Sequence, residues 1–200
     1  MDDMILAYGQ NGEAIRPEQG YPLRLLVPGW EGATHVKWLR RMIVADQPYQ
    51  SRDETSKYTD LMPDGTARQF TFRMEAKSVI TSPSGGQMLP GAGQYEITGL
   101  AWSGTAKVAR VDVTTDGGES WQQARLQEPV LKQAFVRFRL PWKWDGRAVT
   151  IASRCTDETG YVQPSREALI AARGLNSGHH YNGIKLWKVA TDGSVTNAEV

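Results

Sequence analysis

Residues 134–140, AFVRFRL, alternate apolar and charged side chains with a period of two, and this pattern constrains the fold most strongly. In an extended strand, successive side chains point to opposite faces. Arg137 and Arg139 therefore share one face, and the other face holds Ala134, Val136, Phe138 and Leu140. A strand with one apolar face has to pack against a second layer, so this segment predicts a sheet that covers a hydrophobic core.

Segments of the same kind follow one another from residue 76 onward, with turns between them. We expect strands in YEITGLAW (95–102), in AVTIASRCT (148–156) and, as the last one, in GIKLWKVA (183–190). The segment 107–126 predicts a hairpin, because Asp116-Gly117-Gly118 supplies a turn with positive φ angles.

The expected strands each have one apolar face. Ala109, Val111 and Val113 would share a face of the first hairpin strand, and Trp121 would begin the return strand. In segment 148–156 the inner face would hold Val149, Ile151 and Cys155. Residues 76–200 are therefore predicted to be a mainly β domain, an antiparallel β-sandwich of immunoglobulin type.

The first part of the chain has a different pattern. Residues 1–45 contain a hairpin signal at Asn11-Gly12 and an apolar segment, YPLRLLVPG (21–29), that predicts a buried strand. Two or three strands without flanking helices cannot bury both faces of a sheet, so we expect this layer to belong to something larger. Residues 46–75 are polar and rich in turn formers, and are predicted to be a connecting segment.

Composition excludes several classes of function. The formal net charge of +1 gives no sign of nucleic-acid binding, and no apolar run is long enough to span a membrane. The acidic N-terminus lacks an apolar signal core, so we expect no export signal in this chain. One cysteine and three scattered histidines exclude an internal disulfide and argue against a metal cage.

Two candidate catalytic groups have simpler structural explanations. Cys155 shares its phase with Val149 and Ile151, so we expect a buried thiol that acts as a small hydrophobic residue. Asp157 and Glu158 follow the end of a strand, and although paired carboxylates can serve as acid and base, we expect a capped turn.

Two clusters of donors leave alternatives open. His35 and Lys37 would lie on one side of a short extended segment, with Val36 and Trp38 on the other side, and Arg24 on a neighbouring strand. These cations form either a solvated strand end or an anion site. Arg173 lies in AARGLNSGHHYNG, which is either a polar loop or an oxyanion-binding loop, with further donors at Asn176, Ser177, His179 and His180.

A family resemblance bears on both clusters. The segment ILAYGQNGEAIRPEQGYPLRLLVPGWEGATHVKWLRR (5–41) resembles the end of the molybdopterin domain in the sulfite oxidase family, through its Asn-Gly turn, Gly-aromatic-Pro-x-Arg strand, Val-Pro-Gly and final Val-Lys-Trp-Leu. GLAWSG with VARVDVTTDGGESWQQARL, and TDETGYVQP with ARGLNS, resemble that family's immunoglobulin-like dimerisation domain. FRMEAKSVITSPSGGQMLPG, LQEPVL, WKWDG and SRCTDETGYVQP are similar to the molybdenum subunit of the bacterial Sox thiosulfate-oxidising complex, the sulfane dehydrogenase.

The resemblance implies roles for particular residues. Arg24, His35, Val36 and Lys37 match positions that contact the molybdenum–molybdopterin cofactor, and Arg173 matches an arginine that attracts the anionic sulfur substrate. Gln19 matches a cofactor position where many members have histidine, and an amide there can donate a hydrogen bond but brings no charge. Intact members would transfer oxygen from water to sulfite or to protein-bound sulfane sulfur, and pass two electrons to a c-type cytochrome.

The resemblance also implies what this chain lacks. The family's molybdenum-ligating cysteine and active-site tyrosine would precede Met1, and Cys155 cannot replace that ligand. We therefore expect the C-terminal portion of a periplasmic enzyme: a remnant of the mixed α/β molybdopterin-binding domain (1–45), the connecting segment (46–75) and a homodimer-forming sandwich (76–200). Alone, it is expected to hold no molybdenum and to be inactive.

Two functions of other classes compete with this one. The chain could be a non-catalytic immunoglobulin-like module for interaction or dimerisation. It could also be a sugar-binding sandwich that uses Trp142 and Trp144, which are then expected to be exposed.

Overall fold

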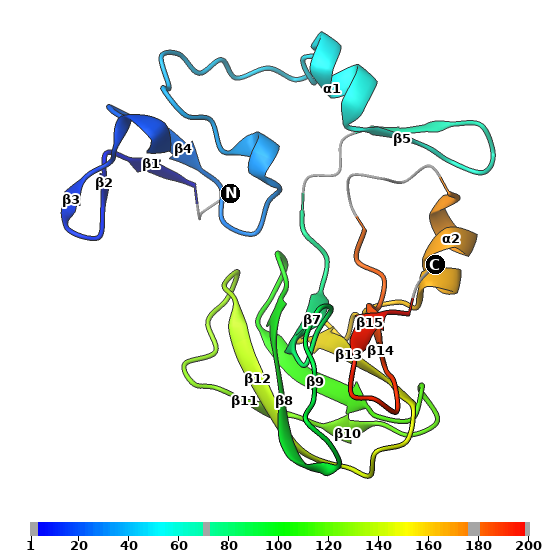
Figure 1. Ribbon diagram of the computed structural model, residues 1–200. Helices are drawn as coiled ribbons and strands as arrows, with labels where there is room; N and C mark the ends of the chain where they lie inside the picture. Colours follow the sequence, from blue (N-terminus) through cyan, green and yellow to red (C-terminus); the bar gives the residue numbers. More distant parts are fainter. Residues whose placement is uncertain (1–3, 70–72, 176–180, 199–200) are drawn as a thin grey trace. The chain divides into compact units, whose positions relative to one another are not determined.

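The computed structural model describes residues 4–69, 73–175 and 181–198 of the 200-residue chain. These residues form two compact units (Figure 1). The first unit comprises residues 1–74 and 173–180, and the second comprises residues 75–172 and 181–200.

The second unit is built from two antiparallel sheets (Figure 1). Its strands are β7 (Lys77–Ser82), β8 (Gly93–Trp102), β9 (Val108–Thr114), β10 (Gln122–Gln123), β11 (Arg125–Leu126), β12 (Val136–Trp144), β13 (Val149–Asp157), β14 (Leu186–Val189) and β15 (Val195–Asn197). The five-stranded sheet has the order β10-β9-β13-β14-β15, and the four-stranded sheet has the order β11-β12-β8-β7. The predicted immunoglobulin-like antiparallel sandwich is confirmed.

The alternation that predicted β12 continues along the whole strand. Val136, Phe138 and Leu140 are buried, while the residues between them are exposed. The same phase carries Trp142 and Trp144 into the core, where they are only 8% and 2% exposed. The prediction that these tryptophans are exposed was wrong, because their positions continue the inner face of the strand. Neither side chain is available to stack on a sugar.

Two other predictions about the strands need correction. Ala109 is exposed, and Val108 is buried in its place with Val111 and Val113. The register between β9 and β13 shifts at Thr156/Asp157, and this bulge reverses the phase of the first residues of β9. The strand predicted in 183–190 forms as β14, but it is followed by β15 and is not the last.

One glycine allows the neighbouring strands β8 and β12 to pack closely at the core. Gly99 in β8 lies opposite Phe138 in β12. A Cβ atom added at Gly99 would lie 2.2 Å from Cζ of Phe138 and 2.3 Å from the carbonyl oxygen of Val79. Real Cβ contacts are never this short, and the backbone oxygen cannot move away without disturbing the pairing of β7 with β8.

We expect Gly99→Ala to lower the free energy of unfolding by roughly 3 kcal/mol, because the methyl group overpacks the core. Urea denaturation measures this change. The matched control is Gly93→Ala in the same strand, where the nearest atom, Cε2 of Tyr95, would lie at 3.7 Å. We expect this control to change stability by no more than about 0.5 kcal/mol. Equal effects of the two substitutions would contradict the packing argument.

The first unit contains short elements. Its strands are β1 (Ile5–Ala7), β2 (Gly9–Gln10), β3 (Glu13–Ala14), β4 (Arg24–Leu26), β5 (Thr59–Leu61) and β6 (Ala67–Gln69), and its helices are η1 (Pro17–Gln19), η2 (Gly32–Thr34) and α1 (Arg52–Lys57). The turn predicted at Asn11-Gly12 joins β2 to β3, with φ angles of 54° and 82°. The strand predicted in 21–29 is only three residues long and half-buried, because β1 is its one strand partner among the residues that the structure describes.

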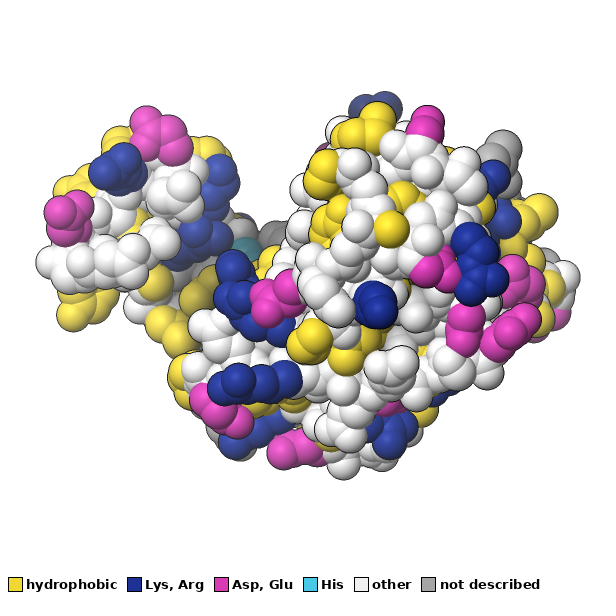
Figure 2. Space-filling view, turned by 60° about the horizontal axis from the view of Figure 1, so that its bottom comes forward, with side chains coloured by type: hydrophobic (Ala, Val, Ile, Leu, Met, Phe, Trp, Pro, Cys, Tyr) yellow, Lys and Arg dark blue, Asp and Glu magenta, His cyan; other side chains and the backbone are white. Residues whose placement is uncertain are grey.

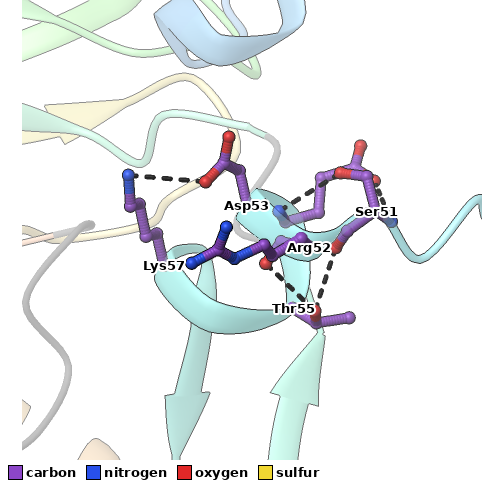
Figure 3. A network of polar contacts seen from close by, with 6 residues as sticks. Ser51, Arg52, Asp53, Thr55 and Lys57 are labelled. Atoms are coloured by element: carbon purple, nitrogen blue, oxygen red, sulfur yellow. Dashed lines mark hydrogen bonds and ion pairs between the residues drawn. The ribbon is translucent and has the colours of Figure 1, made fainter.

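Residues 46–75 contain more structure than a polar connection requires. Helix α1 begins with a capping box, in which the Ser51 hydroxyl accepts from the Glu54 N–H and the Glu54 carboxylate accepts from the Ser51 N–H (Figure 3). Lys57 pairs with Asp53 one turn earlier, at 3.4 Å between Nζ and Oδ1, and both side chains are well exposed (Figure 3). A hairpin of β5 and β6 follows.

Helix α2 (Arg166–Arg173) was not predicted: its last three residues belong to the segment expected to be a loop, and its first five had no expected element. Among the described residues, no helix has the length and apolarity needed to cross a membrane.

Candidate functional site

Backbone hydrogen bonds place the segment around Lys37 beside β4. The N–H of Leu25 donates to the carbonyl of Val36 at 2.8 Å, and the N–H of Leu39 donates to the carbonyl of Leu23 at 2.8 Å. The chain after η2 therefore returns alongside the strand that carries Arg24. The sequence analysis expected Arg24 on a strand next to this segment, and the two hydrogen bonds place the segments side by side.

Gly20 permits the closest contact between these two segments. Its φ of 109° is a value that residues with side chains rarely adopt. A Cβ atom at this position would lie 2.9 Å from Cβ of Lys37 and 3.0 Å from its Cα. Any larger residue would separate Lys37 from the turn that Gly20 caps.

Three side chains converge on the carbonyl groups of η1. Their donors come from both paired segments, although the acceptors belong to one short turn. The bonds run from Trp38 Nε1 to Pro17 O at 2.9 Å, from Lys37 Nζ to Glu18 O at 3.0 Å and from Arg24 Nη1 to Gln19 O at 3.1 Å. The two cations are thus oriented by neighbouring carbonyls of the same turn.

Lys37 and Arg24 are held at this turn and still have donors with which to bind an anion. The Lys37 ammonium lies 4.6 Å from the centroid of the Trp38 ring, a cation–π contact. The bond to Glu18 uses one of the three donors of Lys37, and the bond to Gln19 uses one of the five donors of Arg24. Nε of Arg24 is buried and has no acceptor among the described residues. A buried donor of this kind is costly until an acceptor reaches it.

His35 does not join Arg24 and Lys37. Its Nε2 lies 3.1 Å from the carbonyl oxygen of Trp30, whereas Arg24 and Lys37 donate to carbonyls of η1. The predicted alternation fails here because His35 caps η2 with a ψ of 86° and Trp38 has a φ of 53°, so the segment is not a regular strand. Lys37 and Trp38 consequently reach the same turn, although alternation placed them on opposite sides.

The remaining residues of the first cluster lie at its edge. The Val36 side chain is exposed, and its carbonyl accepts the Leu25 bond that holds the segment in place. The Gln19 side chain is exposed as well, while its backbone carbonyl accepts the bond from Arg24.

Arg173 is the last residue of α2 and is buried, with 9% of its surface exposed. Gly174 follows with a φ of 76°, which ends the helix. The neighbouring donors Asn176, Ser177, His179 and His180 lie outside the described residues.

Cys155 and Asp157, the candidate nucleophile and the candidate acid or base in the sandwich, both have structural roles. Cys155 is fully buried, and burial, followed by the nearby charge of Asp157, raises the pKa of its thiol to about 12. Asp157 is also buried and holds a turn, since it accepts from the Ser103 hydroxyl at 2.8 Å and from the Thr159 N–H at 3.0 Å. Within the part of the chain that the structure describes, no group of histidine, cysteine and acidic residues could hold a metal ion.

Comparison with known families identifies the class of this protein. Residues 68–186 match the Mo-co oxidoreductase dimerisation domain, and residues 1–53 match the oxidoreductase molybdopterin binding domain. The chain belongs to the family of molybdopterin oxidoreductases that contain this dimerisation domain, and the cofactor of that family is molybdenum bound to molybdopterin. The family resemblance and the cofactor predicted from the sequence are confirmed.

Individual relatives differ in the share of their length that is matched. The sulfane dehydrogenase SoxCD from Paracoccus pantotrophus is 54% identical with a TM-score of 0.95, over 100% of this chain and 52% of that chain. An NADH nitrate reductase of Hordeum vulgare is 34% identical over 193 residues, which is 82% of this chain and 21% of the reductase. Nitrate reductase 1 of Phaseolus vulgaris is 38% identical over 191 residues, with 82% and 22% covered. The chain thus spans about a fifth of the nitrate reductases and about half of the SoxCD chain.

Proposed function

We propose that this chain is the C-terminal part of a molybdenum-cofactor oxidoreductase that oxidises sulfite or protein-bound sulfane sulfur. The observation that carries the proposal is the convergence of Arg24 and Lys37 on η1. Two cations held by one turn are a site for an anionic group, and molybdopterin carries a phosphate. The 54% identity to a sulfane dehydrogenase supports the choice of a sulfur substrate.

The residues at this turn fit the cofactor. The buried Nε–H of Arg24 lacks an acceptor among the described residues. A phosphate oxygen is a strong acceptor and would form a charge-assisted hydrogen bond with it. Arg24 and Lys37 would hold the phosphate, with Val36 and Gln19 beside the pterin. His35 would contact the pterin, since its Nε2 lies 3.1 Å from the carbonyl oxygen of Trp30 and the two cations donate to η1. When bound, the molybdenum group would supply the redox chemistry.

An exposed apolar surface in the first unit supports a larger molybdopterin-binding domain. Met4, Ile5, Leu6 and Tyr8 are each between 46% and 76% exposed. Figure 2 shows hydrophobic side chains on the surface of the lobe at the left, which contains the first strands. Such patches normally pack against other protein, so we propose that residues 1–45 complete a domain whose other part supplies the molybdenum-ligating cysteine.

The proposed roles of the other regions follow the family. Arg173 would attract the anionic substrate, because a buried guanidinium always keeps its charge. The sandwich of residues 76–200 would form a homodimer, and residues 46–75 would connect it to the cofactor domain. Electrons would pass to a c-type cytochrome, and the enzyme would work in the periplasm.

Lys37→Ala in the full-length parent enzyme should lower molybdenum content, measured by elemental analysis of the purified protein. Loss of one charge-assisted hydrogen bond should weaken retention of the cofactor by roughly tenfold. Lys57→Ala is the matched control, since that lysine pairs with Asp53 on the surface of α1. A Lys37 variant with the metal content of the control would remove Lys37 from the cofactor site.

Arg173→Met in the same enzyme should raise KM for the sulfur substrate by about tenfold or more, because the anion loses a charged partner. Steady-state kinetics measures the change, and thermal unfolding should shift far less. Arg166→Met, at the opposite end of α2, is the control and should keep the parent KM. A parent KM in the Arg173 variant would place the substrate arginine elsewhere.

A further inference from the structure

Gln163 carries a fully buried side-chain amide and lies in the segment between β13 and α2. The residue is 1% exposed, and its backbone N–H donates to the carbonyl of Cys155 at 2.9 Å. An uncharged polar side chain in such a position must use its hydrogen-bonding groups within the protein.

The carbonyl oxygen of this amide joins the two sheets. Oε1 accepts from the N–H of Ser78 at 2.8 Å and from its hydroxyl at 2.9 Å. The same oxygen accepts from the N–H of Cys155 at 3.1 Å. Ser78 belongs to β7 of the four-stranded sheet and Cys155 to β13 of the five-stranded sheet, so one atom connects both layers.

The amino group of Gln163 reaches the segment that returns after α2. Nε2 donates to the carbonyl of Gly183 at 3.3 Å and to that of Ser78 at 3.4 Å. Next to it, the N–H of Ile184 donates to the carbonyl of Pro164 at 2.9 Å. These bonds close the neck of an excursion of the chain, residues 165–182, that contains all of α2.

A second buried amide holds the returning segment from the other side. Asn182 is 1% exposed, and its Nδ2 donates to the carbonyl of Ala76 at 3.3 Å and to the hydroxyl of Tyr161 at 3.0 Å. Both ends of the excursion are therefore fixed to the sandwich by buried side-chain amides. Helix α2 begins three residues after Gln163 and continues without interruption to Arg173.

We propose that Gln163 is a positioning residue for Arg173: by closing the neck it sets where α2 starts and therefore where its last residue lies. This inference rests on the proposed role of Arg173 in substrate binding. A continuous helix moves as a body, so loosening its first turn displaces its end. A misplaced charge binds the anion less well, while the cofactor site in residues 19–37 is untouched.

The test is a double-mutant cycle in the full-length, cofactor-loaded enzyme with the variants Gln163→Met, Arg173→Met and both together. Methionine keeps the length of glutamine and removes its hydrogen bonds. We expect Gln163→Met to raise KM about tenfold with unchanged molybdenum content, and to add nothing once Arg173 is gone. An additive loss in the double variant would mean a general structural role and would overturn the proposal.

A milder variant and a surface control keep the test decisive if Gln163→Met fails to fold. Ser78→Ala removes one of the donors to Oε1 and should raise KM by about threefold, with the same dependence on Arg173. Gln123→Met, at an exposed position of β10, should leave KM unchanged. If Ser78→Ala has the same KM as the parent enzyme, this result counts against the proposal that the bonds of Gln163 position Arg173.

Hydrogen exchange separates this proposal from the proposed function. In Gln163→Met or Ser78→Ala, the backbone amides of residues 165–173 and of Ile184 should exchange faster, whatever the reaction is. Unchanged exchange of these amides would overturn the proposal that Gln163 holds α2, and would leave the proposed function untouched. A different result is faster exchange in these variants while Arg173→Met has the same KM as the parent enzyme. This result would support the role of Gln163 in holding α2 and would overturn the role of Arg173 in substrate binding.

Discussion

The contact between Gly20 and Lys37 is the constraint on which the candidate site depends. Without a Cβ atom at Gly20, the two segments approach to a separation that any side chain would prevent. The approach lets Arg24, Lys37 and Trp38 all donate to one turn of three residues. Backbone geometry thus brings the two charges of Arg24 and Lys37 to one turn, and the acceptors that orient them are neutral carbonyls that leave both charges available to an anion.

The second unit carries most of helix α2 in the chain between β13 and β14, and the helix ends at Arg173, where the chain passes into the first unit. The core supplies rigidity through close packing of β8 and β12 around Gly99. Buried amides then fix the neck through which α2 leaves and returns. A neutral amide can satisfy donors and acceptors in an apolar interior without the desolvation cost of a buried charge.

The sequence predicted the parts of the fold that depend on periodicity and turn chemistry. The alternation in AFVRFRL led directly to β12, and Asn11-Gly12 led to the first hairpin. The same alternation, carried further, would have placed Trp142 and Trp144 inside. The failures at Ala109 and His35 have one cause, since a bulge and a left-handed Trp38 each change the phase that alternation assumes.

The convergence on η1 and the amide clamp could not be predicted from local patterns, because their partners are distant in sequence. Lys37 and Glu18 are 19 residues apart, and Gln163 and Ser78 are 85 apart. The one local signal was a glycine before Tyr-Pro at position 20, which indicates a turn but not its contact with Lys37. Alternation and the family resemblance both grouped Arg24 with Lys37, and the roles of these two residues toward a cofactor remain a proposal.

The most direct measurement of the central claim is a crystal structure of the full-length parent enzyme with molybdopterin bound. The account predicts that Arg24 and Lys37 both lie within hydrogen-bonding distance of the phosphate while η1 keeps its position. A structure in which other residues hold the phosphate, with Arg24 and Lys37 directed away from it, would contradict the account.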